Sequence, residues 1–150
     1  MPTATGELPR VVLDTNAVLD WLYFRDVRCA TLAGAVTGHR IRWIASAPMR
    51  DEIEHVLERG GLGTRWPEGP ETVRHGWRRW ATMVEATAGG APLAMRCTDA
   101  DDQKFIDLAL GVRAVALLSA DRAVLRLARR AAALGLVIST VARWTMAAPP

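Results

Sequence analysis

The chain has 150 residues, of which 50% are hydrophobic and 23% charged. This size and composition fit one globular domain and exclude a disordered chain. The formal net charge is +3 and the isoelectric point is near 9.5, a mild basic excess that favours a polyanionic partner without requiring one.

The sequence gives no sign of secretion, membrane insertion or a disulfide framework. The longest uncharged run, residues 131–142, is too short to span a bilayer, and residues 1–10 lack the apolar core of a signal peptide. Cys29 and Cys97 lie far apart without a CxxC pattern, so we expect two reduced thiols. The prediction is a cytoplasmic protein without a membrane partner.

In chain order, the first predicted strand is the most informative element. Residues 11–13 form a continuous apolar run after Arg10, and Asp14, Thr15 and Asn16 follow directly. Such a run is typical of a parallel strand buried on both faces. Ligands bind at the carboxyl ends of these strands, so Asp14 is a candidate site residue. Asp14 could equally be only the N-cap of the following helix.

Two helices and a second strand are expected next. Residues 17–24 and 29–36 are predicted helices, the latter ending at Gly38, and residues 42–45 are a predicted strand. Ser46 is then expected to cap a third helix that ends before residue 60.

The third helix carries two acids that compete for a functional role. Its apolar residues form one stripe, with Glu52 at one edge and Glu54 at the other. Helical periodicity alone does not show which of the two, Glu52 or Glu54, is the site residue.

The middle of the chain predicts a loop, a helix and a linker. Residues 60–70 are rich in glycine and proline and predict a loop, and residues 88–95 predict a linker. Residues 71–87 predict a helix with Trp77, Trp80 and Val84 buried and its arginines solvated; an RNA-contacting face is the alternative.

The second informative stretch is an acidic helix start. Asp99, Asp101 and Asp102 precede a helical apolar stripe that ends at Gly111, and Asp102 lies on the side that faces the core. Some of these acids could simply cap the helix. A calcium loop is excluded, because Lys104 stands where that loop needs glycine.

The last part of the chain repeats the design of the first strand. Residues 114–118 are an apolar run that leads into Ser119 and Asp121, followed by a predicted helix at 123–134 and a strand at 136–139. Strands thus alternate with helices, which predicts an α/β protein: a three-layer α/β/α sandwich around a mainly parallel sheet of four to five strands. The expected domain spans residues 10–145, with tails at 1–9 and 146–150.

The predicted topology brings acids from distant elements to one edge of the sheet. Asp14, Glu52, Asp102 and Asp121 all lie at element ends that should converge there. Carboxylates in such proximity repel one another unless they are protonated or bridged by cations. Oxygen ligands without a nearby histidine or cysteine favour Mg²⁺ or Mn²⁺ over zinc, and phosphodiester hydrolysis is the natural chemistry.

These motifs together resemble the PIN domain family, in the branch of toxins of toxin–antitoxin pairs. The resemblance covers about residues 10–140 and rests on Asp14-Thr15-Asn16, the acid after Ser46, the stretch from Asp99 to Phe105, and Ser119-Ala120-Asp121. It implies a metal-dependent endoribonuclease that acts on single-stranded or structured RNA.

The resemblance also implies roles for individual residues. Asp14, Asp102 and Asp121 would bind Mg²⁺ or Mn²⁺ and Glu52 would complete the catalytic set, with Glu52, Asp99 and Asp101 as further candidate metal ligands. Asn16 and Ser119 would support the site through hydrogen bonds. The arginines expected to steer the RNA backbone are Arg50, Arg122 and Arg126.

Partners and rival functions remain open at this point. A cognate antitoxin and a homodimer, built on the helices around Trp21 and Trp80, are the expected protein partners. A phosphoaspartate enzyme is disfavoured, since it needs a second aspartate where Asn16 stands. The stronger rival is a non-catalytic module that binds nucleic acid or protein.

Overall fold

The fold was obtained as a computed structural model, which describes residues 7–59, 68–86 and 91–146. Most of the predicted 60–70 loop, part of the 88–95 linker and most of both predicted tails lie outside these residues. The described residues form an all-parallel sheet of five strands in the order β3-β2-β1-β4-β5. The strands are β1 (Arg10–Leu13), β2 (Arg42–Ser46), β3 (Ala81–Val84), β4 (Ala116–Leu118) and β5 (Val137–Ser139).

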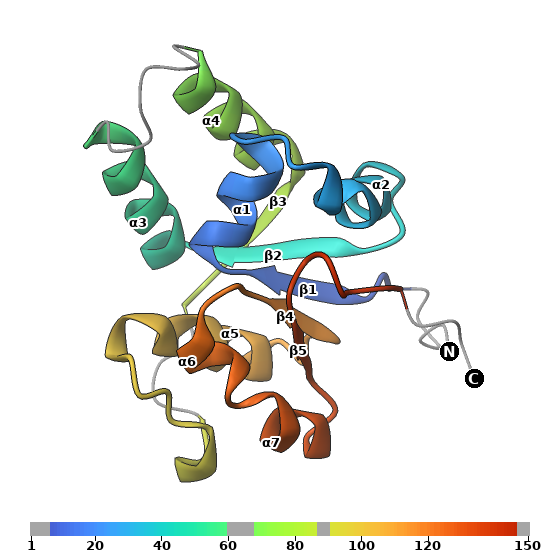
Figure 1. The fold of residues 1–150 in the computed structure, drawn as a ribbon, viewed down its shortest axis with the longest axis vertical. Coiled ribbons are helices and arrows are strands. Elements are labelled where there is room, and N and C mark those ends of the chain that lie inside the picture. Colours follow the sequence, from blue (N-terminus) through green and yellow to red (C-terminus); the bar gives the residue numbers. More distant parts are fainter. Residues whose placement is uncertain (1–6, 60–67, 87–90, 147–150) are drawn as a thin grey trace.

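Helices cover both faces of this sheet. Figure 1 shows α1 to α4 on one face and α5 to α7 on the other. Their bounds are α1 (Thr15–Leu22), α2 (Ala30–Thr37), α3 (Ala47–Glu58), α4 (Gly69–Trp80), α5 (Gln103–Gly111), α6 (Arg122–Leu125) and α7 (Ala128–Ala133). Short 3₁₀ turns are η1 (Val27–Cys29), η2 (Leu93–Met95) and η3 (Ala100–Asp102). The predicted three-layer α/β/α sandwich is confirmed.

The central strand β1 explains the continuous apolar run at the start of the chain. Val11 and Val12 are fully buried, because helices cover both faces of the sheet at this position. Leu13 of β1 pairs with Leu118 of β4, and the Asp14 amide continues the ladder to the Leu118 carbonyl at 3.0 Å. The two strands therefore end side by side, and the residues that follow them must meet.

A cluster of three tryptophans forms the core under α1 and α4. Trp43 of β2 is fully buried, and Trp21 and Trp77 contact it edge-on, with ring centroids 5.5 and 4.8 Å away. Trp21 is therefore a core residue and offers little surface to a partner.

The structure corrects the predicted helix at 71–87. The helix begins earlier, at Gly69, with Pro70 in its first turn, and it ends at Trp80. Residues 81–84 form the edge strand β3, which pairs with β2 from Trp43 to Ser46. Thr82 and Val84 are β-branched and suit a strand, but a half-buried edge strand showed no clear alternation in the sequence. Trp80 and Val84 are consequently only partly buried.

The predicted helix at 123–134 is also wrong in part, because it is broken into α6 and α7. The Leu127 amide bonds the Val124 carbonyl at 3.0 Å, an i→i−3 bond that tightens the turn between the two helices. Side chains three residues apart align in such a turn, which lets Val124 and Leu127 both enter the core. Gly135, with φ of +83°, then turns the chain into β5.

Among the described residues, no helix combines the length and apolar character needed to cross a membrane.

Candidate active site

Asp14 is both a helix cap and a buried acid at the carboxyl end of β1. Its Oδ1 accepts a hydrogen bond from the Ala17 amide at 2.8 Å, which caps α1, while Oδ2 accepts one from the Ser119 hydroxyl. Only 3% of Asp14 is exposed. Burial raises the pKa of Asp14 to about 6, and the nearby charge of Asp121 adds to this, although both hydrogen bonds oppose the rise.

Ser119 joins the ends of the two central strands. Its hydroxyl donates to Asp14 and accepts a hydrogen bond from the Asp121 amide at 3.0 Å. Asp121 in turn caps α6, because its Oδ1 accepts from the Ala123 amide at 2.8 Å. One buried hydroxyl thereby fixes Asp14 and the Asp121 backbone relative to each other.

Asp121 also belongs to a group of three carboxylates that lie close together. Asp99, Asp102 and Asp121 each offer a ligand atom, and these atoms lie within 4.8 Å of one another. Burial and the neighbouring Asp121 raise the pKa of Asp102 to about 7, with smaller contributions from Asp99 and Asp14. Asp14 lies outside the 4.8 Å group but acts electrostatically on Asp102.

Asp102 carries the clearest evidence that a cation fits here. It caps α5 without a side-chain hydrogen bond, and its Oδ2 is buried with no partner among the described residues. An unsatisfied buried carboxylate oxygen is costly, and a divalent cation would satisfy it while relieving the repulsion among the three acids. The all-oxygen donor set suits Mg²⁺ or Mn²⁺.

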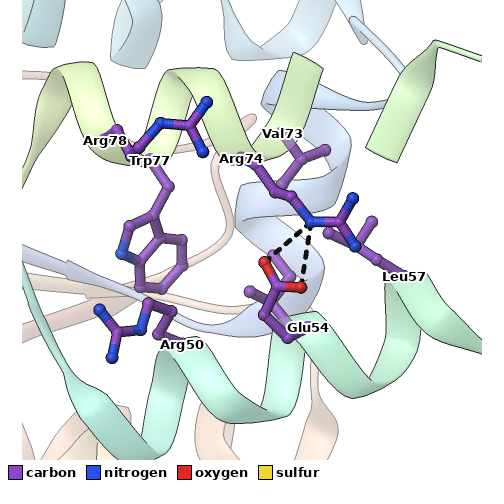
Figure 2. Close-up of a pocket in the computed structure, with 8 residues that line it drawn as sticks. Arg50, Glu54, Leu57, Val73, Arg74, Trp77 and Arg78 are labelled. Atoms are coloured by element: carbon purple, nitrogen blue, oxygen red, sulfur yellow. Dashed lines mark hydrogen bonds and ion pairs between the residues drawn. The ribbon is translucent and has the colours of Figure 1, made fainter. Parts of the chain in front are cut away.

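The structure separates the two acids of α3 that the sequence left equivalent. Glu52 accepts hydrogen bonds from the Thr15 hydroxyl, next to Asp14, and from Lys104 Nζ at 2.6 Å. Glu54 lies on the other side of the helix, where Arg74 Nε donates to both of its oxygens at 3.0 Å (Figure 2). Glu52, and not Glu54, thus adjoins the aspartates.

Among the residues that the structure describes, the side chains of two other predicted site residues, Asn16 and Asp101, form no hydrogen bond with this group of acids. Asn16 is exposed on α1, and in the described part of the chain its side chain makes no hydrogen bond. Asp101 is also exposed, although its carbonyl accepts from Lys104.

The three arginines proposed for RNA occupy different places. Arg122 and Arg126 are exposed at α6, directly after Asp121. Arg50 instead lines a cavity of about 200 Å³ between α3 and α4, beside Trp77 and the Glu54–Arg74 pair (Figure 2).

Sequence reasoning missed three polar residues that hold the site. Thr15 and Lys104 donate hydrogen bonds to Glu52. The Gln103 side chain accepts a hydrogen bond from the Cys97 amide at 2.5 Å and donates one to the buried Asp107 at 2.9 Å. Gln103 thereby ties the segment that carries Asp99 to α5. Lys104 had one available signal, since it is the only lysine in the chain.

Comparison with known proteins identifies a family for this chain. A family model described as PIN domain matches residues 10–123, whereas a search of curated proteins gives no match. The match spans β1 through the start of α6 and includes every acid described above. PIN domains have a nuclease-type fold and are generally metal-dependent nucleases. This chain belongs to the PIN domain family.

Proposed function

We propose that this protein is a Mg²⁺- or Mn²⁺-dependent endoribonuclease and the toxin of a toxin–antitoxin pair. The observation that carries the nuclease proposal is the cluster of Asp99, Asp102 and Asp121 with its buried, unpartnered Asp102 oxygen. A divalent cation among these carboxylates would offset their mutual repulsion.

Asp102 and Asp121 would hold the cation, with Asp14 beside them and Asp99 as a flanking ligand. When bound, the ion supplies charge neutralisation for a phosphodiester and activation of water. Ser119 keeps Asp14 oriented and the Asp121 backbone in register. Exposed Arg122 and Arg126, on the helix that follows Asp121, would attract the phosphate backbone of RNA.

The direct test is cleavage of an unstructured, end-labelled single-stranded RNA with excess Mn²⁺. We expect internal cuts that EDTA abolishes, and a loss of roughly 10²–10⁴-fold in Asp102→Asn, the range for removing a key electrostatic or proton-transfer group. Asp51→Asn is the matched control, because Asp51 is an exposed acid of α3. A single-stranded DNA of the same sequence tests the preference for RNA.

The main alternative is a non-catalytic module of the same fold. RNA retained in a shift assay without any Mn²⁺-dependent cutting would favour this alternative. The toxin role needs a separate observation: growth arrest on expression that an adjacent antitoxin gene relieves. The homodimer needs a solution mass, from light scattering, of about twice the 16.4 kDa of the chain.

A further inference from the structure

Lys104 lies at the point where α3 and α5 meet at the carboxyl edge of the sheet. Its Nζ is 2.6 Å from Glu52 Oε1 and 2.5 Å from the carbonyl oxygen of Asp101. The ammonium also lies 4.9 Å from the ring centroid of Phe105, which is 1% exposed and fixed in the core. Lys104 is therefore held on three sides.

The Lys104 ammonium has surroundings that resemble those of a hard metal ion. A carboxylate oxygen and a backbone carbonyl oxygen are typical ligands of Mg²⁺, Mn²⁺ and Ca²⁺, and such ions bind oxygen at about 2.0–2.6 Å. Lys104 Nζ meets both oxygens in short, charge-assisted hydrogen bonds. The side chains of Lys104 and Glu52 are only 26% and 31% exposed, so water screens this pair incompletely.

In this arrangement two protein donors hold the Glu52 carboxylate. Thr15 donates to Oε2 and Lys104 donates to Oε1, so both carboxylate oxygens already have a donor. The group of acids that can share an ion in the described residues consists of Asp99, Asp102 and Asp121, without Glu52. The site thus has two positions for positive charge: one among the aspartates and one at Glu52.

We infer that Lys104 is a built-in cation that takes the position of a second metal ion at Glu52, so that the site binds one divalent ion. This inference rests on the proposed metal-dependent function and fixes the number of metals, which the sequence leaves open. Lys104 is a positioning residue in this scheme, because it acts through Glu52.

The test counts bound ions and does not depend on activity. Mn²⁺ is titrated into the purified protein, and free Mn²⁺ is followed by electron paramagnetic resonance. We expect about one tightly bound ion in the wild type and about two in Lys104→Ala, where Glu52 and the Asp101 carbonyl are free to bind a weaker second ion. Lys104→Arg retains the charge and should bind about one.

Two further variants control for unrelated effects. Arg129→Ala removes an exposed cation on α7 and should still bind about one ion. The double change Glu52→Gln with Lys104→Ala removes the carboxylate as well and should lose the second ion. Circular dichroism checks that each variant is folded.

The outcomes separate this inference from the proposed function. About two tightly bound ions in the wild type would overturn the role of Lys104 and leave the metal-dependent function standing, and this measurement needs no variant. A single ion in Lys104→Ala, with unchanged affinity, would likewise overturn it. No Mn²⁺ binding by the wild type would overturn both proposals.

Discussion

The Ser119 hydroxyl donates a hydrogen bond to the Asp14 carboxylate across the junction of β4 and β1. The residues are 105 positions apart in the chain, and they meet because Leu13 and Leu118 pair as the last residues of adjacent parallel strands. Both side chains are almost completely buried. Asp14 is thus oriented by the sheet itself and does not depend on a bound substrate.

Removing the Ser119 hydroxyl should destabilise the fold and the site together. Ser119→Ala leaves Asp14 Oδ2 without its donor, and a buried acceptor left unsatisfied costs about 1–3 kcal/mol. We expect this loss in the free energy of urea unfolding at pH 7, together with weaker Mn²⁺ binding. Ser119→Thr keeps the hydroxyl and hence the donor to Asp14, so this variant should stay closer to wild type than Ser119→Ala. Equal losses in both variants would contradict the role of the hydroxyl.

The stability of the metal-free protein should fall as pH rises from about 4 to about 7. Folding raises the pKa of Asp14 from its ordinary value of 3.8 to about 6, and that of Asp102 from 3.8 to about 7. The folded state therefore binds more protons than the unfolded state across this window, and the free energy of unfolding decreases with pH. Urea unfolding in EDTA at a series of pH values measures this slope. Saturating Mn²⁺ should flatten it, and a rise in stability over the same window without metal would contradict the shifted pKa values.

Asp102→Asn should separate stability from metal binding. The amide removes a poorly solvated charge next to Asp121, so the metal-free variant should be more stable than wild type by about 0.5–2 kcal/mol. Mn²⁺ at a hundredfold excess over its dissociation constant should stabilise the wild type by about 2.7 kcal/mol and the variant by much less. Differential scanning fluorimetry with and without Mn²⁺ reads both effects. A metal-free Asp102→Asn less stable than wild type would show that Asp102 serves the fold.

The sequence predicted the fold and most of the acids because those signals are local. A continuous apolar run followed by an acid marks β1 and Asp14, and the same pattern marks β4 and Asp121. Parallel strands place both acids at one edge, so their convergence followed from topology alone. The edge strand β3 was missed because its residues are only partly buried and pair on one side.

The partners of Glu52 could not be read from the sequence, because they are tertiary contacts. Thr15 and Lys104 lie 37 and 52 residues from Glu52 in the chain, and no spacing rule connects them. The two interpretations of Asp14, helix cap and site acid, were posed as alternatives, yet one carboxylate has two oxygens and makes both contacts.

The two acids of α3 should respond differently to the same substitution. Glu52→Gln weakens the contacts with Thr15 and Lys104 next to the aspartates, so we expect a large loss of Mn²⁺-dependent RNA cleavage. Glu54→Gln breaks an ion pair with Arg74 between α3 and α4 whose side chains are about one-third exposed, which should cost at most about 1 kcal/mol of stability and leave cleavage unchanged. Parallel cleavage and urea unfolding assays compare the variants. Equal loss of cleavage in both would show that α3 acts only as a scaffold.

The exposed arginines of α6 should contribute to RNA affinity through charge alone. Arg122 and Arg126 follow Asp121 and make no ion pair within the described residues, whereas Arg50 lines the cavity between α3 and α4. The logarithm of the RNA-binding constant falls linearly with the logarithm of the salt concentration, and each phosphate contact to a single strand contributes about 0.7 to the steepness of this slope. The double change Arg122→Ala and Arg126→Ala should therefore make the slope shallower by about 1.4. Arg50→Ala, which removes one exposed arginine on the far side of α3 from Glu52, should leave the slope unchanged. Fluorescence anisotropy at several salt concentrations measures these slopes, with every variant made in Asp102→Asn protein so that the RNA is not cut. A shallower slope in Arg50→Ala alone would contradict the prediction and indicate that RNA binds on the α3–α4 side.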